Sequence, residues 1–209
     1  MTTRSLLIAL DADGVLLDYN RGFGNMWKAY FNQPDLVECD TSAYHAARYW
    51  GVEPPARGHG FWDHFDQNGW RTMPAMPGAV EACNALVQAG HRLVCVTSMP
   101  EHRADDRLYN LQSLGFPIER VIATGSKFGC TSNPKKEAIE ALKPDWFVDD
   151  ELRKLKDLDG INLVLINPGH SDCPNRGQPK DFLHMEVSDL LEFAQRITRL
   201  DPKPTRSFR

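Results

Sequence analysis

The sequence predicts an α/β fold in which a doubly wound parallel sheet carries one inserted helical segment. Several short apolar runs show no polar alternation, which is typical of strands buried on both faces in parallel sheets. Helical patterns separate these runs along the chain. Strand and helix patterns that alternate in this way favour a doubly wound sheet.

Three of the expected strands end abruptly in small polar or acidic residues. These strands and the residues that follow them are 6–10 with Asp11 and Asp13, 92–96 with Thr97 and Ser98, and 146–148 with Asp149 and Asp150. Two further strands are expected over 120–123 and 161–166. Since ligands of open α/β sheets bind outside the carboxyl ends of the strands, the three abrupt ends mark the candidate site.

Helices are expected between and after these strands. They cover 77–89, 102–114, 133–142 and 188–198. The first is bounded by a proline near its start and by a glycine just past its end, as helices often are. In the third, Asn133 is the expected N-cap and Pro134 the first helical residue.

The interval 19–76 differs from the rest of the chain. It holds most of the aromatic residues and no strand-like run. A connection this long exceeds one crossover helix, so the sequence predicts a mainly helical cap inserted after the first strand. The expected organisation is a core formed by 1–18 and 77–200, a cap over 19–76 and a solvated tail over 201–209.

Charge and cysteine content restrict the classes of partner. The formal net charge of −4 provides no basic field for a nucleic acid polymer, so such a partner is not expected. The five cysteines include no CxxC pair, which favours reduced thiols and a cytoplasmic protein. The apolar stretch near the N-terminus is too short for a signal peptide or a membrane span, so no membrane association is expected.

The acidic strand ends predict a metal site. Carboxylates brought this close repel one another by ~1–4 kcal/mol per pair at about 4 Å. A hard divalent cation removes that repulsion, and a ligand set made only of oxygen atoms suits Mg²⁺. The cation would in turn attract a phosphate group, so a small phosphorylated substrate is expected.

These residue types also fit phosphoryl transfer. A carboxylate beside Mg²⁺ can attack phosphorus and form an acyl phosphate. Thr97 can donate to a phosphoryl oxygen, and Lys135 or Lys136, at the start of the third helix, can neutralise another. Asp13 can protonate the leaving oxygen and later activate water.

Asp11-Ala12-Asp13-Gly14-Val15 after an apolar strand resembles the DxDGV motif of the haloacid dehalogenase superfamily of hydrolases. Val96-Thr97-Ser98 resembles its second motif, the lysine before a helix its third, and Phe147-Val148-Asp149-Asp150 its acidic fourth, in the family's order over about 6–165. The resemblance implies a magnesium-dependent phosphatase with Asp11 as nucleophile and metal ligand. It also implies that Asp13 is the general acid/base and gives its carbonyl to the metal, and that Asp149 and Asp150 are acidic metal ligands, of which Asp150 aligns best.

Three segments resemble the 5'(3')-deoxyribonucleotidase branch in particular, which implies a nucleoside monophosphate substrate. They are Pro77-Gly78-Ala79-Val80, Thr97-Ser98-Met99-Pro100 and Val148-Asp149-Asp150. In that branch the lysine lies nearer the third strand, which favours Lys127, whereas the helix start favours Lys135. The alternatives are an inactive small-molecule binding protein of the same fold and a carbon–halogen hydrolase, which would have little use for Asp13.

Overall fold

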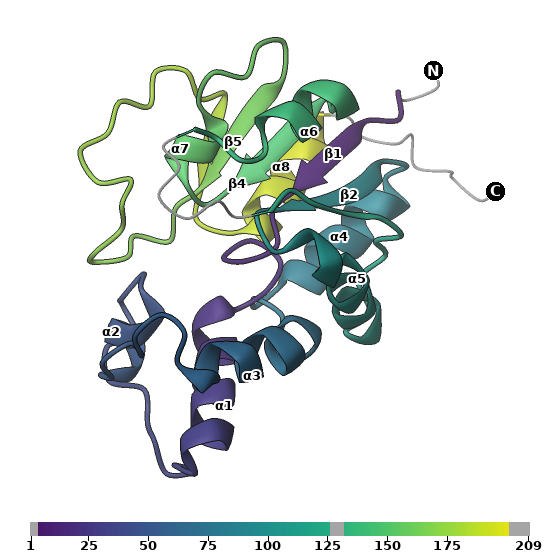
Figure 1. Ribbon diagram of the computed structural model, residues 1–209. Helices are drawn as coiled ribbons and strands as arrows, with labels where there is room; N and C mark the ends of the chain where they lie inside the picture. Colours follow the sequence, from purple (N-terminus) through teal and green to yellow (C-terminus); the bar gives the residue numbers. More distant parts are fainter. Residues whose placement is uncertain (1–3, 126–131, 201–209) are drawn as a thin grey trace, which may run out of the picture.

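A computed structural model describes residues 4–125 and 132–200. Its centre is a parallel sheet of six strands in the order β3-β2-β1-β4-β5-β6 (Figure 1). The strands are β1 (Leu7–Leu10), β2 (Arg92–Thr97), β3 (Val121–Ala123), β4 (Trp146–Asp149), β5 (Asn162–Ile166) and β6 (Met185–Val187). The predicted doubly wound parallel sheet is confirmed, and five of its strands were expected; the short edge strand β6 was not.

Helices cover both faces of the sheet. Along each strand alternate residues point to opposite faces, so β1 buries Leu10 on one side and Ala9 on the other. The first face packs against α4 (Ala79–Gln88), α5 (Ala104–Ser113) and α8 (Leu190–Leu200). The second packs against α6 (Lys136–Leu142) and the short α7 (Leu152–Leu155). Burial on both faces explains why the strand sequences lack polar alternation.

Helix α6 begins later than the sequence predicts. Its first residue is Lys136 and its N-cap is Lys135, so Asn133 and Pro134 precede the helix. The Asn133 side chain still caps the turn, because its Oδ1 accepts a hydrogen bond from the Lys135 amide at 3.0 Å. The expected helix 102–114 is likewise divided into a 3-10 turn, η2 (Glu101–Arg103), and α5.

The inserted segment is helical. It contains α1 (Tyr19–Phe31), α2 (Ala46–Trp50), α3 (Gly60–Asn68) and the 3-10 turn η1 (Gly69–Arg71). Asp18 caps α1 by accepting from the Arg21 amide at 2.9 Å. Gly24 lets α2 approach, because a Cβ there would lie 2.0 Å from the Trp50 ring. Figure 1 shows these helices gathered beyond the carboxyl end of the sheet.

Two strand-like connections join this segment to the sheet. Leu17 forms an isolated antiparallel bridge with Ala75, and the Met76 amide donates to the Leu16 carbonyl at 2.9 Å. The chain therefore leaves and re-enters the core at one place, next to the end of β1. Within the described ranges 4–125 and 132–200, no helix combines the length and apolarity needed to cross a membrane.

Candidate active site

The site forms where the chain reverses direction across the sheet. Strands β1 and β4 are neighbours, while β2 and β3 lie to one side and β5 and β6 to the other. Such a switch point leaves a crevice at the carboxyl ends of the two central strands. Asp11 follows β1 directly, and Asp149 is the last residue of β4. The amide of Asp11 donates to the Val148 carbonyl at 2.9 Å, which locks the two strand ends together.

Asp11 is almost completely buried, at 2% exposure, yet it stays ionised. Its Oδ1 accepts from the Ala12 amide at 2.6 Å and lies 2.6 Å from Lys135 Nζ. Burial raises the pKa of Asp11, but the ammonium groups of Lys135 and Lys154 and the Ala12 amide outweigh it, so the net pKa is lowered. Lys154 Nζ approaches the other oxygen, Oδ2, at 3.9 Å.

Lys135 is the central cation of the site. Its side chain is fully buried, and Nζ lies 2.6 Å from Asp11 Oδ1 and 2.6 Å from Asp149 Oδ2. A buried ammonium is tolerated only with close anionic partners. Lys135 therefore bridges the ends of β1 and β4.

Asp149 and Asp150 differ in what their carboxylates bind. Asp149 uses both oxygens within the protein, one for Lys135 and one for the Glu151 amide at 2.9 Å. Asp150 instead lies against the loop after β1, so close that a Cβ on Gly14 would stand 2.5 Å from its Oδ2. Burial, then Asp149 and Asp11, raise the pKa of Asp150 well above its usual range. An added cation would relieve this unfavourable state.

The residues present fit a divalent metal ion. Asp11, Asp149 and Asp150 each offer a carboxylate oxygen, and these atoms lie within 4.8 Å of one another. Because both Asp149 oxygens are already bonded, Asp150 is the better placed ligand of the pair. The Asp13 carbonyl accepts no hydrogen bond from a described residue, so it remains available as a further oxygen donor. Oxygen ligands of this kind suit Mg²⁺.

A hollow of about 280 Å³ lies beside Asp11 and Asp13. Thr97 and Ser98, at the end of β2, line its wall together with Trp70 of η1. The Ser98 hydroxyl is buried without a hydrogen-bond partner among the described residues. A buried hydroxyl without a partner is costly, so this one is suited to a ligand oxygen.

A second hollow, of about 440 Å³, shares Asp13 and Lys154 with the first. Asp13, Asp150 and Lys154 line it, with aromatic residues of the inserted segment that include Tyr19 and Tyr44. The Tyr44 side chain is hydrogen-bonded to Asp150; burial and then the Asp150 carboxylate raise the pKa of Tyr44. Carboxylates of the site therefore line both hollows, Asp11 the first and Asp150 the second.

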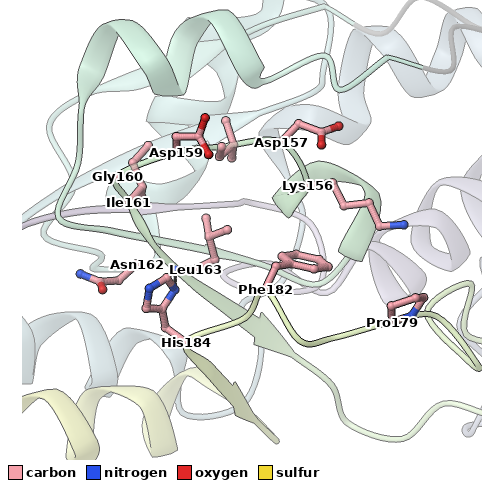
Figure 2. A pocket seen from close by; sticks show the side chains of 11 residues that line it. Lys156, Asp157, Asp159, Gly160, Ile161, Asn162, Leu163, Pro179, Phe182 and His184 are labelled. Carbon is pink, nitrogen blue, oxygen red and sulfur yellow. Dashed lines mark hydrogen bonds between the residues drawn. The ribbon is translucent and has the colours of Figure 1, made fainter.

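A third hollow, larger in volume than these two, lies away from these groups. It measures about 700 Å³ and occupies the amino end of β5 (Figure 2). Figure 2 shows Phe182 and His184 beside Asn162 and Leu163. None of the carboxylates of the acidic cluster lines it, so volume alone does not identify the site.

Comparisons with known proteins identify the fold of the chain. No family model matches the sequence. The protein named "Putative nucleotidase OB0422" from Oceanobacillus iheyensis is 28% identical over 104 residues, 50% of this chain and 54% of that protein. The match thus spans about half of each. The protein named "putative HAD-hydrolase YfnB" from Bacillus subtilis, solved bound to magnesium, superposes with a TM-score of 0.61 at 14% identity, covering 93% of this chain and 99% of that one.

The chain has the haloacid dehalogenase-like fold. A protein named as a predicted phosphoglycolate phosphatase from Haemophilus somnus has the same fold, with a TM-score of 0.59 and 15% identity over 94% of this chain and 99% of that one. The resemblance inferred from the four motifs is thereby confirmed at the level of the fold.

This haloacid dehalogenase-like fold brings most of the predicted site residues together. One hollow is lined by Asp11, Asp13, Thr97 and Ser98. The carboxylate of Asp11 also lies close to Lys135, Asp149 and Asp150. Lys136 is not among them: its Nζ lies 3.7 Å from Glu140 on the solvent side of α6. Lys127 falls outside the described residues.

Sequence reasoning missed two residues of the site. Lys154 is mostly buried; despite burial, Asp149, Asp11 and Asp150 raise its pKa, so it remains a cation. Asn175 holds the end of β4 by donating to the Asp150 carbonyl at 2.7 Å and accepting from the Leu152 amide at 2.9 Å. The only signal for Lys154 was its place in the sequence, four residues after Asp150 and within the short helix α7 that follows it.

Proposed function

We propose that the protein is a magnesium-dependent phosphatase that hydrolyses a small phosphomonoester through an aspartyl-phosphate on Asp11. The observation that supports it best is the state of Asp11. This buried, ionised carboxylate has one oxygen bonded to lysine and backbone, and it stands beside two further carboxylates and a hollow lined by hydroxyl groups. A phosphoryl group needs a nucleophile, a cation and hydroxyl or amide donors in one place.

Oδ2 of Asp11 is the proposed nucleophile. Oδ1 lies 2.6 Å from the Ala12 amide nitrogen and 2.6 Å from Lys135 Nζ, whereas Lys154 Nζ approaches Oδ2 only to 3.9 Å. Oδ2 attacks phosphorus, forming the Oδ2–P bond while the bond from phosphorus to the leaving oxygen breaks. Lys154, 3.9 Å from Oδ2, and the Ser98 hydroxyl stabilise the negative oxygens of the phosphoryl group.

Asp13 is the proposed general acid and base. It gives a proton to the leaving oxygen as the first bond breaks, and the alcohol departs. It then takes a proton from the water that attacks the aspartyl-phosphate, so that Asp11 is restored and inorganic phosphate is released. Asp11, Asp150 and the Asp13 carbonyl would hold Mg²⁺. When bound, Mg²⁺ supplies Lewis-acid polarisation of a phosphoryl oxygen.

The segment 19–76 is the proposed cap, and 1–18 with 77–200 the proposed catalytic unit. Trp70 of this cap lines the smaller hollow, while Tyr19 and Tyr44 line the hollow of about 440 Å³. Aromatic rings at such a wall can stack on a planar base. This lining, together with the name of the Oceanobacillus relative, favours a nucleoside monophosphate as substrate.

Two alternative activities are less well supported. A carbon–halogen hydrolase needs the nucleophile but no cation, so it would leave the cluster of Asp149 and Asp150 without a purpose. An inactive binding protein would have no need for an ionised Asp11 whose Oδ2 accepts no hydrogen bond from a described residue.

The test is hydrolysis of a panel of phosphate esters with and without Mg²⁺. The panel should contain nucleoside monophosphates, phosphoglycolate and 4-nitrophenyl phosphate. Asp11→Asn should lower kcat by at least about 1,000-fold and abolish the acid-stable phosphoenzyme trapped by rapid quenching. Exhaustive chelation should remove activity, and added Mg²⁺ should restore it.

The matched control is Asp145→Asn, because Asp145 precedes β4 at the opposite end of the sheet. It should retain activity within about twofold. Wild-type rates in Asp11→Asn, or full activity after chelation, would refute the proposal.

A further inference from the structure

Arg107 is the largest fully buried side chain of the described residues, and the mechanism proposed above does not use it. It lies on α5, which follows β2, and its guanidinium is sealed from solvent. A buried cation is unfavourable unless a close anion compensates it. Its place in the fold therefore depends on its anionic partner.

That partner is Asp13, the proposed general acid and base. Arg107 Nη2 donates to Asp13 Oδ1 at 2.8 Å. The other oxygen, Oδ2, forms no hydrogen bond with a described residue, and the Asp13 side chain is 27% exposed beside both hollows. One oxygen of the carboxyl group is thus tied to α5, while the other remains available.

Arg107 also contacts the segment that returns from the cap. Its Nη1 lies 3.3 Å from Met73 Sδ, and its guanidinium carbon lies 5.4 Å from the centre of the Trp70 ring. One turn along α5, Asn110 Nδ2 donates to the Met73 carbonyl at 3.0 Å. Arg107 and Asn110 therefore share the contact with Met73, but only Arg107 reaches Asp13.

We propose that Arg107 is a positioning residue that orients the Asp13 carboxyl group for proton transfer to the leaving oxygen. The inference rests on the proposed phosphatase function. Because Arg107 occupies Oδ1, it confines the transferable proton to Oδ2 and restrains rotation of the carboxyl group. Without Arg107, the Asp13 side chain could adopt other rotamers in which Oδ2 no longer faces the leaving oxygen.

The chemistry of the leaving group distinguishes this role from a structural one. When an alkyl phosphate is cleaved, the P–O bond breaks to an oxygen that needs the Asp13 proton to leave as an alcohol. When 4-nitrophenyl phosphate is cleaved, the phenolate is stable and leaves without that proton. A misplaced general acid therefore slows the first reaction much more than the second.

The experiment compares kcat/KM for an alkyl phosphate and for 4-nitrophenyl phosphate in wild type, Arg107→Met and Arg107→Lys. This ratio reports phosphoryl transfer to Asp11 and excludes the later hydrolysis of the aspartyl-phosphate, which both esters share. Arg107→Met should lower kcat/KM for the alkyl ester by about 100-fold and for the aryl ester by less than about threefold. Arg107→Lys, which keeps the charge but not the planar fork, should recover part of the alkyl activity. Asn110→Ala is the control, since it loses the Met73 contact without touching Asp13, and it should leave the ratio of the two rates unchanged.

Equal losses on both esters, or the same altered ratio in Asn110→Ala, would show a structural role and overturn the inference. If the wild type hydrolyses neither ester, the proposed phosphatase function is refuted. The positioning role of Arg107 is then tested independently, by crystal structures of the wild type and Arg107→Met. The Asp13 carboxylate should leave its wild-type position in Arg107→Met; an unchanged position refutes positioning.

Discussion

The two ends of the sheet use the same kinds of polar residue for different purposes. At the amino ends, Asp145 Oδ2 accepts from the Leu7 amide at 2.8 Å, and His184 Nδ1 accepts from the Leu163 amide at 3.1 Å. Besides these backbone donors, Asp145 pairs with the exposed side chain of Arg4. At the carboxyl ends, Asp11 and Asp149 also accept from backbone amides, but in addition both bind the fully buried side chain of Lys135.

The difference teaches that a polar group can take part in binding or catalysis only if the fold leaves some of its hydrogen-bonding capacity unused. The hollow at the amino end of β5 is the larger one, and Figure 2 shows His184 beside Leu163, the residue whose amide it accepts from. The smaller hollow at the carboxyl end is lined by an ionised Asp11 and by Ser98, whose hydroxyl has no partner among the residues that the structure describes. Side chains that accept hydrogen bonds from backbone amides at the ends of strands stabilise the fold. Side chains with unsatisfied hydrogen-bonding capacity can bind a ligand.

Among substitutions at the two ends of the sheet, Lys135→Met at the carboxyl end is expected to have the largest effect. Removal of the ammonium leaves two buried carboxylates without their shared partner, which should lower the free energy of unfolding by about 3–5 kcal/mol. Urea unfolding in the absence of Mg²⁺ measures this loss. Lys136→Met is the adjacent control and should change it by no more than about 0.5 kcal/mol, because the half-exposed Lys136 forms a solvent-accessible ion pair with Glu140. Similar losses in both variants would contradict the central role of Lys135.

A smaller effect is expected from Gly14→Ala, compared with Gly160→Ala at the other end of the sheet. Both glycines have a positive φ, +84° and +73°, so each substitution carries backbone strain of about 1 kcal/mol. Only at Gly14 would the new Cβ also displace Asp150. Gly14→Ala should therefore raise the Mg²⁺ concentration for half-maximal activity by about tenfold, while Gly160→Ala should not change it.

The outcome that would break this prediction is an equal Mg²⁺ requirement in the two glycine variants. Urea unfolding of both proteins separates the shared strain from the displacement of Asp150. Such a result would mean that Asp150 does not help to hold the cation.

The smallest effect is expected from Asp145→Ala at the amino end. It removes the hydrogen bond to the Leu7 amide and should lower the free energy of unfolding by about 1 kcal/mol. Activity per folded molecule should stay unchanged. A large loss of kcat in this variant would show that the two ends of the sheet are not separate in function.

Much of this architecture follows from local patterns. Each central strand is recognisable because its residues are buried on both faces, and the acidic residues of the site follow directly in the sequence at 11, 13, 149 and 150. Helix α4 is bounded within a few residues by the signals near Pro77 and Gly90. The start of α6 was misplaced by two residues, because the side chain of Asn133 caps a turn before the helix rather than the helix itself.

Short-range patterns sufficed for the strands, the helices and the acidic motifs, since hydrophobic periodicity and strand-end chemistry act between near neighbours. Long-range packing determines that Lys135, and not Lys136, contacts the buried carboxylates, and it also brings Lys154 and Asn175 to the site. It likewise buries Arg107 against Asp13, 94 residues away in the chain. Burial decides such partnerships, because a charge removed from water must take whichever opposite charge the folded chain brings within reach.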